Sequence, residues 1–181
     1  MKTVQPIRSY SKIEELKTEL LRNSYRDYFL FVFGLNSGLR ISDILPLKVK
    51  DVKNKHFLIA KETKTGKDRR IPMLPNLKIE IEKYIAGMKP EDYLFRSLRT
   101  RKPITRIQAY RILKSAAEKV GLEEIGTHTM RKTFGYHFYQ QQKDVAMLQK
   151  IFNHSSPSIT LRYIGIDEDM INEAFMKFGG L

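Results

Sequence analysis

The chain has 181 residues, 41% of them apolar, which is enough for one folded domain with a substantial core. Its 33 Lys and Arg against 20 Asp and Glu give a formal net charge of +13, and this excess favours a polyanionic partner, nucleic acid above all. The lack of cysteine excludes disulfides, thiolate zinc sites and cysteine catalysis, and no stretch is apolar enough for a membrane span or a signal-peptide core.

The first part of the chain predicts two helices that lead into a glycine stop. A capping-box pattern predicts that the first helix begins at Ser11. A second helix is expected over 24–36, with a wide apolar face typical of core packing, and Gly38 ends it through a left-handed cap. Arg40 follows at the front of a short apolar turn, where a guanidinium suits a phosphate. Taken alone, a surface pair with Asp43 is the plainer interpretation of that arginine.

The pattern over 47–72 predicts β-structure. Short apolar runs separated by turn signals indicate the strands of a small antiparallel sheet. One hairpin of this sheet carries the basic residues Lys64, Lys67, Arg69 and Arg70. Gly66 and Lys67 do not form the phosphate loop of nucleotide-binding proteins, because the flanking positions lack the required Gly and Ser or Thr. A hairpin lysine such as Lys64 is usually solvated, so its position alone implies no ligand.

A basic segment follows the next expected helix, which spans 76–88. The stretch 96–117 contains no acidic residue, and its basic residues are Arg96, Arg99, Arg101, Lys102, Arg106, Arg111 and Lys114. A helix opens at Pro103, and its apolar face is expected to comprise Ile107, Tyr110, Leu113 and Ala117. A basic loop followed by a helix with its charges off the apolar face favours a DNA-backbone contact over an ordinary solvated face.

A histidine and an arginine at the start of one helix suggest phosphate chemistry. Thr127 can cap a helix that begins at His128, which places His128 and Arg131 on one face of its first turns. Backbone N–H groups at that end of a helix also favour an anion. With His154 and Tyr163 downstream, the chain has an anion clamp, proton carriers and a hydroxyl nucleophile for attack on a phosphodiester. Tyr163 is nevertheless one of nine tyrosines, most of which are expected in structural roles.

Three further helices are expected toward the end of the chain. The pattern predicts one over 144–152, a short one over 158–164 that carries Tyr163, and an amphipathic one over 167–178. A hinge-like joint at Gly165 precedes the last helix. Its apolar face comprises Met170, Ile171, Ala174, Phe175 and Phe178.

The order of these motifs resembles the catalytic domain of the tyrosine recombinases, the phage-integrase family, over about residues 10–178. The family's first box, Gly-x-Arg-x-Ser-Glu, stands here at 38–43 with Asp43 in place of Glu, and its lysine hairpin stands at 64–72. The remaining boxes match His128 to Arg131, Phe152 to Ser156 and Thr160 to Tyr163. Asn153 replaces a glycine that can need a positive φ, a conformation that Asn tolerates best after Gly. Five boxes in the family's order are a strong signal, although each alone is weak.

This resemblance implies roles for individual residues. The implied catalytic residues are Arg40, Lys64, His128, Arg131, His154 and Tyr163. Tyr163 would attack phosphorus to form a 3′-phosphotyrosyl link, while the two arginines and the second histidine stabilise charge on the non-bridging oxygens. Lys64 would protonate the leaving 5′-oxygen, and His128 would assist proton transfer with Tyr163. Asp43 supports the site from behind. The expected DNA contacts are Lys67, Arg69, Arg99, Arg101, Lys102, Arg106 and Arg111. Because the covalent link keeps the bond energy, neither nucleotide, metal nor other cofactor is required.

The expected fold is α+β, mainly α-helical with a small three-stranded antiparallel sheet. It comprises a catalytic domain over 1–165 and a C-terminal helical tail over 166–181. The N-terminal DNA-binding domain usual in the family is not expected, since the catalytic part begins almost at Met1. The expected function is site-specific DNA recombination, whether integration, excision or resolution. The expected partner is double-stranded DNA, with a homotetramer assembled on it through the C-terminal helix, in the cytoplasm at the nucleoid and without membrane or nucleotide.

Two alternatives stay open. A non-catalytic DNA-binding relative would keep the basic surface without needing the six catalytic residues together, and their joint presence argues against it. A type IB topoisomerase uses similar chemistry but relaxes supercoils as a monomer, without exchange between sites. The sequence does not identify the DNA site.

Overall fold

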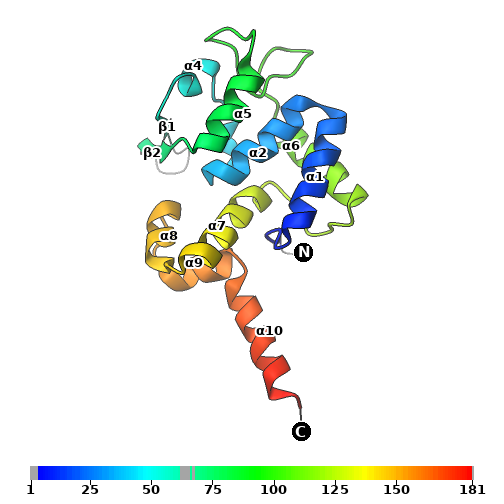
Figure 1. Ribbon diagram of the computed structural model, residues 1–181, viewed down its shortest axis with the longest axis vertical. Helices are drawn as coiled ribbons and strands as arrows, with labels where there is room; N and C mark the ends of the chain where they lie inside the picture. The colour runs from blue at the N-terminus through cyan, green and yellow to red at the C-terminus, as the bar shows by residue number, and fades with distance from the viewer. Residues whose placement is uncertain (1–3, 62–65, 67, 181) are drawn as a thin grey trace.

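The computed structural model of the chain describes residues 4–61, 66 and 68–180. Figure 1 shows a body made mostly of helices, with a small sheet at one side and a last helix that projects away from the body. The expected α+β, mainly helical class is confirmed. Within the described residues, no helix is long and apolar enough to cross a membrane.

The N-terminal helices form the centre of the larger core. Helix α1 (Tyr10–Asn23) is capped by the Ser9 hydroxyl and begins slightly earlier than the capping-box pattern predicts. Helix α2 (Tyr25–Ser37) buries residues on nearly all sides, including Phe29, Leu30, Phe31, Val32 and Phe33. As predicted, Gly38 ends it in the left-handed conformation, with φ of 61°. Helix α2 lies between α1 and the later helices α5 and α7, so it connects the two halves of the body.

The sheet has two strands in the described residues, and the prediction of a third is wrong. Strands β1 (Phe57–Lys61) and β2 (Asp68–Pro72) pair antiparallel. The segment expected as the first strand forms the short helix α4 (Val49–Val52), after the equally short α3 (Ile41–Ile44). The Asp51 carboxylate accepts the backbone N–H of Lys48, which fixes a helical start. Val49 and Val52, three residues apart, are then buried on one face.

Helices α5 (Pro75–Ile85) and α6 (Arg106–Lys119) complete the larger core. Thr105 and Gln108 form a capping box at the start of α6. The predicted apolar face of α6 is partly wrong. Its buried residues are Ala109, Leu113, Ala116 and Ala117. Ile107 and Tyr110 are exposed instead, because the small alanine side chains form the face that packs against α1.

A second, smaller hydrophobic cluster lies between α7 (Thr129–Gln142), α8 (Val145–Phe152) and α9 (Pro157–Tyr163). Its fully buried members are Leu148, Phe152, Ile164 and Ile166. Gly135 permits this packing, because a Cβ there would lie 2.7 Å from both Phe152 and Ile164. Asn153 ends α8 with φ of 55°, which confirms that this position adopts the left-handed conformation.

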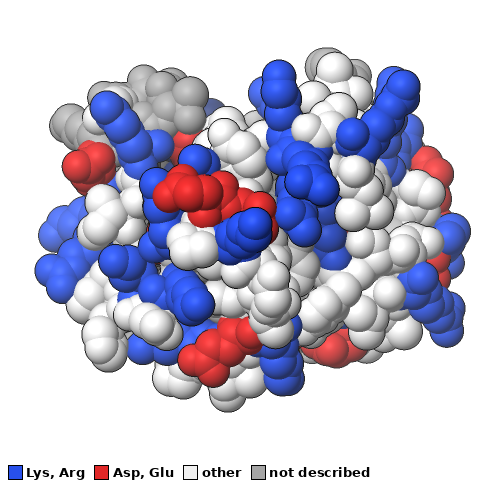
Figure 2. All heavy atoms as spheres, turned by 90° about the horizontal axis from the view of Figure 1, so that it is seen from above, with Lys and Arg blue, Asp and Glu red and all other residues white. Residues whose placement is uncertain are grey.

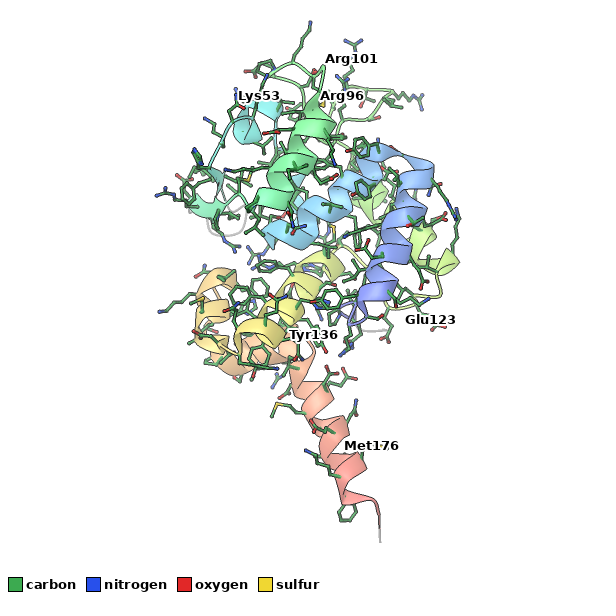
Figure 3. The ribbon with its side chains drawn as sticks, viewed as in Figure 1. Lys53, Arg96, Arg101, Glu123, Tyr136 and Met176 are labelled. Atoms are coloured by element: carbon green, nitrogen blue, oxygen red, sulfur yellow. The ribbon has the colours of Figure 1, made fainter. Side chains whose placement is uncertain are left out.

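Helix α10 (Ile166–Phe178) is the projecting helix, and Figure 3 labels Met176 on it, far from the body. The helix predicted over 167–178 is confirmed. Most of its apolar face is exposed: Met170, Ile171, Phe175 and Phe178 all face solvent, and Phe175 is 74% exposed. Most of this face therefore does not pack against the described body.

Candidate active site

Tyr163 lies at the end of α9 and points into the body of its own chain. Its ring lies 5.6 Å from that of Phe152 and 5.1 Å from that of His154, centroid to centroid. Its hydroxyl lies 3.3 Å from Nδ1 of His128, the N-cap residue of α7. The sequence does not indicate whether this tyrosine docks on its own chain; in the structure it does.

Arg131 is buried in the seam between the two hydrophobic clusters and is only 2% exposed. Its guanidinium donates to the carbonyl of Gly38 at 2.6 Å and to that of Phe152 at 3.0 Å. It also lies 4.2 Å from the centroid of the Phe152 ring. One side chain thus joins the end of α2 to the end of α8, two segments far apart in sequence. Gly38 suits this junction, because its positive φ and the nearby Phe134 ring leave little room for a side chain.

Arg40 is the N-cap residue of α3, and its guanidinium lies near the carboxylate of Asp43. The Arg40 Nη1 lies 3.9 Å from the Asp43 carboxylate, which also accepts a hydrogen bond from the Ser42 hydroxyl at 3.4 Å. The sequence allows two interpretations of Arg40, as a phosphate ligand or as the partner of Asp43. The structure contains the Arg40–Asp43 ion pair. Asp43 is buried rather than exposed, however, and Arg40 is largely buried. A buried carboxylate near a guanidinium attracts its charge, and Arg40 lies close enough to Tyr163 to influence its pKa.

His154 is fixed by the helix that carries Tyr163. Its Nδ1 lies 3.0 Å from the Thr160 hydroxyl, which itself donates to the carbonyl of Ser156 at 3.3 Å. Since Thr160 uses its hydrogen on Ser156, its oxygen can accept from the His154 Nδ1–H. Nδ1 is thus occupied within the protein, which leaves Nε2 as the ring atom that can reach a ligand.

The environment shifts the pKa of both members of the His128–Tyr163 pair. Burial raises the pKa of Tyr163, and the nearby Arg131 and Arg40 oppose this rise. Partial burial lowers the pKa of His128, and so does the positive charge of Arg106 and of further cations on α7. At neutral pH the site therefore holds a neutral imidazole beside a protonated phenol, which is the starting arrangement for proton transfer from Tyr163 to His128.

The predicted catalytic lysine, Lys64, lies outside the described residues, and so does Lys67. The strands β1 and β2 that flank them are described, and Arg69 lies half-buried on β2. The structure therefore brings five of the six predicted catalytic residues to one place: Arg40, His128, Arg131, His154 and Tyr163.

Five of the predicted DNA contacts are exposed, whereas Arg69 is half-buried and Lys67 lies outside the described residues. Arg99, Arg101 and Lys102 lie in a loop that Ser97 and Lys102 close with a backbone hydrogen bond of 2.8 Å. Figure 3 labels Arg96 and Arg101 at this end of the molecule, opposite α10. Figure 2 views the molecule from this end and shows Lys and Arg spread widely over it, with fewer acids. Arg106 and Arg111 are exposed on α6.

Two residues near the site were not predicted to be there. Lys132 lies with its Nζ 5.2 Å from the centre of the Tyr163 ring. Arg106, predicted only as a DNA contact, also lowers the pKa of His128. For Lys132, the only signal in the sequence is that it follows Arg131. No sequence signal indicates that Arg106 lies near His128, because a loop separates α6 from α7.

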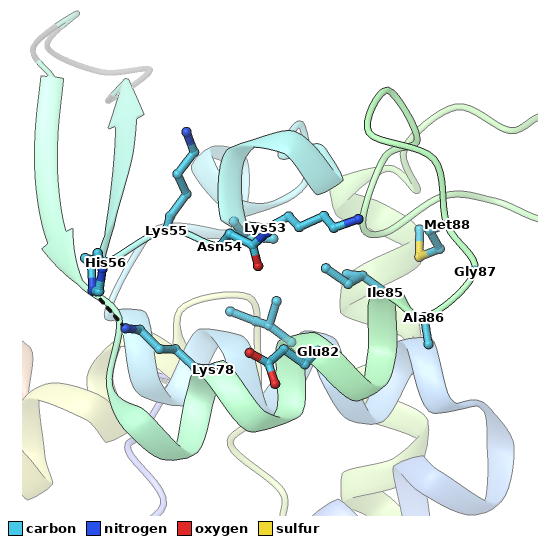
Figure 4. A pocket seen from close by; sticks show the side chains of 12 residues that line it. Lys53, Asn54, Lys55, His56, Lys78, Glu82, Ile85, Ala86, Gly87 and Met88 are labelled. Carbon is cyan, nitrogen blue, oxygen red and sulfur yellow. Dashed lines mark hydrogen bonds between the residues drawn. The ribbon is translucent and has the colours of Figure 1, made fainter.

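The cavity that Figure 4 shows lies elsewhere. It has a volume of about 390 Å³ and is bounded by residues 52–56 and helix α5, where Lys78 bonds to His56 at 3.2 Å. It contains none of the predicted catalytic residues. Within the described part of the chain, no group of three or more His, Cys, Asp or Glu could hold a metal ion.

Comparisons with known proteins agree with the family that the sequence resembles. The profile described as the phage integrase family matches residues 10–170. The chain is 66% identical to the probable integrase/recombinase YoeC of Bacillus subtilis (strain 168), over the full length of both. It is 31% identical to the tyrosine recombinase XerA of Pyrococcus horikoshii over 94% of this chain, and it spans 61% of that protein's length.

Solved structures share the fold. The crystal structure of XerA recombinase superposes with a TM-score of 0.75 at 21% identity, covering 98% of this chain and 65% of the other. XerH site-specific recombinase bound to a palindromic difH substrate, in a post-cleavage complex, gives a TM-score of 0.70 at 19% identity, covering 99% of this chain and 54% of the other.

Proposed function

The chain belongs to the phage integrase family, and from that membership we propose that it is a site-specific tyrosine recombinase that cuts and rejoins DNA. The reaction proceeds through a covalent 3′-phosphotyrosyl intermediate. One observation carries the proposal most: the Tyr163 hydroxyl lies 3.3 Å from His128 and within the influence of Arg40 and Arg131. A nucleophile, a proton acceptor and two anion-stabilising groups thus meet, although they come from separate boxes of the sequence.

The described residues support a definite division of roles. As the Tyr163 oxygen bonds to phosphorus, its proton passes to neutral His128, and the bond to the 5′-oxygen breaks. Arg40, held by Asp43, and Arg131 stabilise the charge that builds on the non-bridging oxygens. His154 reaches the same oxygens through Nε2, since its Nδ1 is held by Thr160. By family resemblance, Lys64 gives the proton that the leaving 5′-oxygen needs. Attack by a 5′-hydroxyl of another strand reverses these steps.

Double-stranded DNA is the substrate we propose, and the basic loop and α6 carry most of the contact. Relatives of similar fold are described as bound to DNA, among them XerH on its difH substrate. The expected contacts are Arg69, Arg99, Arg101, Lys102, Arg106 and Arg111, together with Lys67. Contacts of this kind go mainly to phosphates, so binding will weaken steeply as salt rises.

We further propose that α10 joins protomers into a homotetramer on DNA, with residues 1–165 as the catalytic unit. The exposed apolar face of α10 supports this, because Ile171, Phe175 and Phe178 would be covered by a neighbour. The chain spans the whole of YoeC but about three fifths of the XerA relative.

A suicide-substrate assay tests the activity. Duplexes taken from DNA flanking the gene, nicked next to each candidate cleavage position, are incubated with protein and separated under denaturing conditions. Wild type is expected to form a covalent protein–DNA adduct, and Tyr163→Phe none. Tyr139→Phe is the matched control, since its ring packs in the same small cluster without reaching His128. An adduct that persists in Tyr163→Phe, or its absence from wild type on every flanking duplex, would overturn the proposal.

A further inference from the structure

Residues 4–8, which we call the strap, cross helix α7 next to the candidate active site. The backbone N–H of Ile7 donates to the Thr133 hydroxyl at 2.9 Å. The Lys132 ammonium donates to the carbonyl of Val4 at 2.7 Å. Both Ile7 and Thr133 are buried. The strap is thus fixed to the α7 turn that follows Arg131.

The same ammonium lies against the nucleophile. The Lys132 Nζ, which donates to the Val4 carbonyl, is also 5.2 Å from the centre of the Tyr163 ring. Lys132 is largely buried, so solvent screens the interactions of its charge only weakly. A cation over an aromatic face is attracted to it, more strongly when both are desolvated. The strap carbonyl therefore orients a cation that restrains the Tyr163 ring.

Arg8, at the other end of the strap, holds the joint that follows Tyr163. Its Nε lies 3.0 Å from both carboxylate oxygens of Asp169, in the first turn of α10, and its Nη2 lies 2.8 Å from one of them. Nη2 also donates to the carbonyl of Gly165 at 3.4 Å. The guanidinium lies 5.5 Å from the ring centre of Tyr136, labelled in Figure 3. Gln5 adds a bond of 3.1 Å to Glu168.

These contacts surround a backbone joint that would otherwise be loose. Gly165 has φ of 80°, and α10 has few contacts with the body beyond its first turn. Tyr163 lies only two residues before this joint, so a change in the direction of α10 acts directly on the turn of α9 that carries it. A bidentate arginine–carboxylate pair is directional as well as attractive, so it fixes an angle and not only a distance.

We propose that the strap positions the nucleophile: Arg8 fixes the joint between α9 and α10, and the Val4 carbonyl holds Lys132 against the ring of Tyr163. Arg8 and Lys132 are positioning residues, since neither needs to touch DNA. The proposal rests on Tyr163 being the nucleophile, as argued above. It adds that docking of Tyr163 depends on a segment that lies outside every recognised motif of the chain.

The test separates positioning from binding and from folding. Arg8→Gln is compared with wild type in single-turnover cleavage of the nicked duplex, alongside the Kd for uncleaved DNA. Cleavage is expected to slow roughly fivefold, the scale of one partly exposed charged pair, while Kd changes less than about twofold. Arg22→Gln is the matched control, because it removes an arginine that pairs with Glu19 on the distant helix α1.

Rescue distinguishes this from a general loss of structure. The swap Arg8→Asp with Asp169→Arg is expected to recover most of the rate. Lys132→Arg, which keeps a cation over the ring, is expected to cleave faster than Lys132→Met. If Arg8→Gln does not fold, Asp169→Asn removes the same pair from the other side, and its rate decides the question. Swap and single variants that cleave equally slowly would overturn the proposal.

A second measurement needs no activity. Hydrogen–deuterium exchange of the unbound protein reports opening of the α9–α10 joint. Peptides that cover 160–170 are expected to exchange faster in Arg8→Gln than in wild type or Arg22→Gln. If wild type forms no adduct, the proposed function fails while this measurement still tests the strap. If wild type forms the adduct and Arg8→Gln matches it in both rate and exchange, the strap proposal fails alone.

Discussion

The two hydrophobic clusters of this protein differ in size and in what they carry. The larger one, around α2, α5 and α6, holds most of the buried residues and presents Arg40 at its edge. The smaller one, between α7, α8 and α9, has four fully buried members and carries His154 and Tyr163. Arg131 bonds to a carbonyl from each side. The site is therefore assembled at a seam, and its geometry depends on how the smaller cluster is held to the larger.

The most severe way to break this seam is to remove its arginine. Arg131→Ala leaves the carbonyls of Gly38 and Phe152 without their donor and removes an anion-stabilising group. Cleavage is expected to fall about 10³-fold, the upper range for loss of one such group. Stability is expected to fall by about 2–5 kcal/mol in urea unfolding. Arg162→Ala, on the exposed side of α9, is the control. A variant with near-normal cleavage would contradict a role for Arg131 at the seam.

Protonation of His128 should disable the pair without breaking the seam. Its folded-state pKa lies below the ordinary value near 6.5. As pH falls from there toward the lowered pKa, His128 gains a proton, and the cleavage rate should fall with it. Folding stability should decline over the same window, because the unfolded state binds the proton more readily. His128→Gln should cleave about 10²-fold more slowly and lose this pH dependence. A wild-type profile that is flat below 6.5 would count against His128 as the proton acceptor.

Overpacking should loosen the smaller cluster alone. Gly135→Ala places a methyl group 2.7 Å from Phe152 and Ile164, so these side chains must move. The expected loss is about 1–3 kcal/mol. Hydrogen exchange should increase in α8 and α9 more than in α2. Ser115→Ala, at an exposed site on α6, is the control. Equal increases in both clusters would show that they unfold as one unit.

The smallest expected effect on stability comes from a substitution in α10, which leaves both hydrophobic clusters intact. Phe175→Ser lies on the exposed face of α10, so the stability of the isolated chain should change by less than about 0.5 kcal/mol. If α10 joins protomers, the complex on DNA should lose higher-order species in analytical ultracentrifugation while DNA binding by single protomers persists. Unchanged assembly would remove α10 from the proposed interface.

Local sequence signals determined most of the elements. Gly38 and Asn153 lie where the chain needs a positive φ, and the helices follow from their apolar period and their caps. The wrong strand over 47–52 arose because a short apolar run fits a strand and a helical turn equally well, and the Asp51 cap decided for the helix. The predicted face of α6 holds at Leu113 and Ala117 and is wrong at Ile107 and Tyr110, because alanines, which give a weak apolar signal, form much of the contact.

The sequence by itself determined the chemistry of the site: which residue types are present, in which boxes and in what order. Only the tertiary structure decided that Tyr163 docks on its own chain, that Arg131 joins the two clusters, and that Arg8 reaches Asp169. These contacts link positions up to 161 residues apart. Periodicity and capping report on neighbours within a few residues. Contacts across the fold depend on how whole elements pack, so no local pattern encodes them.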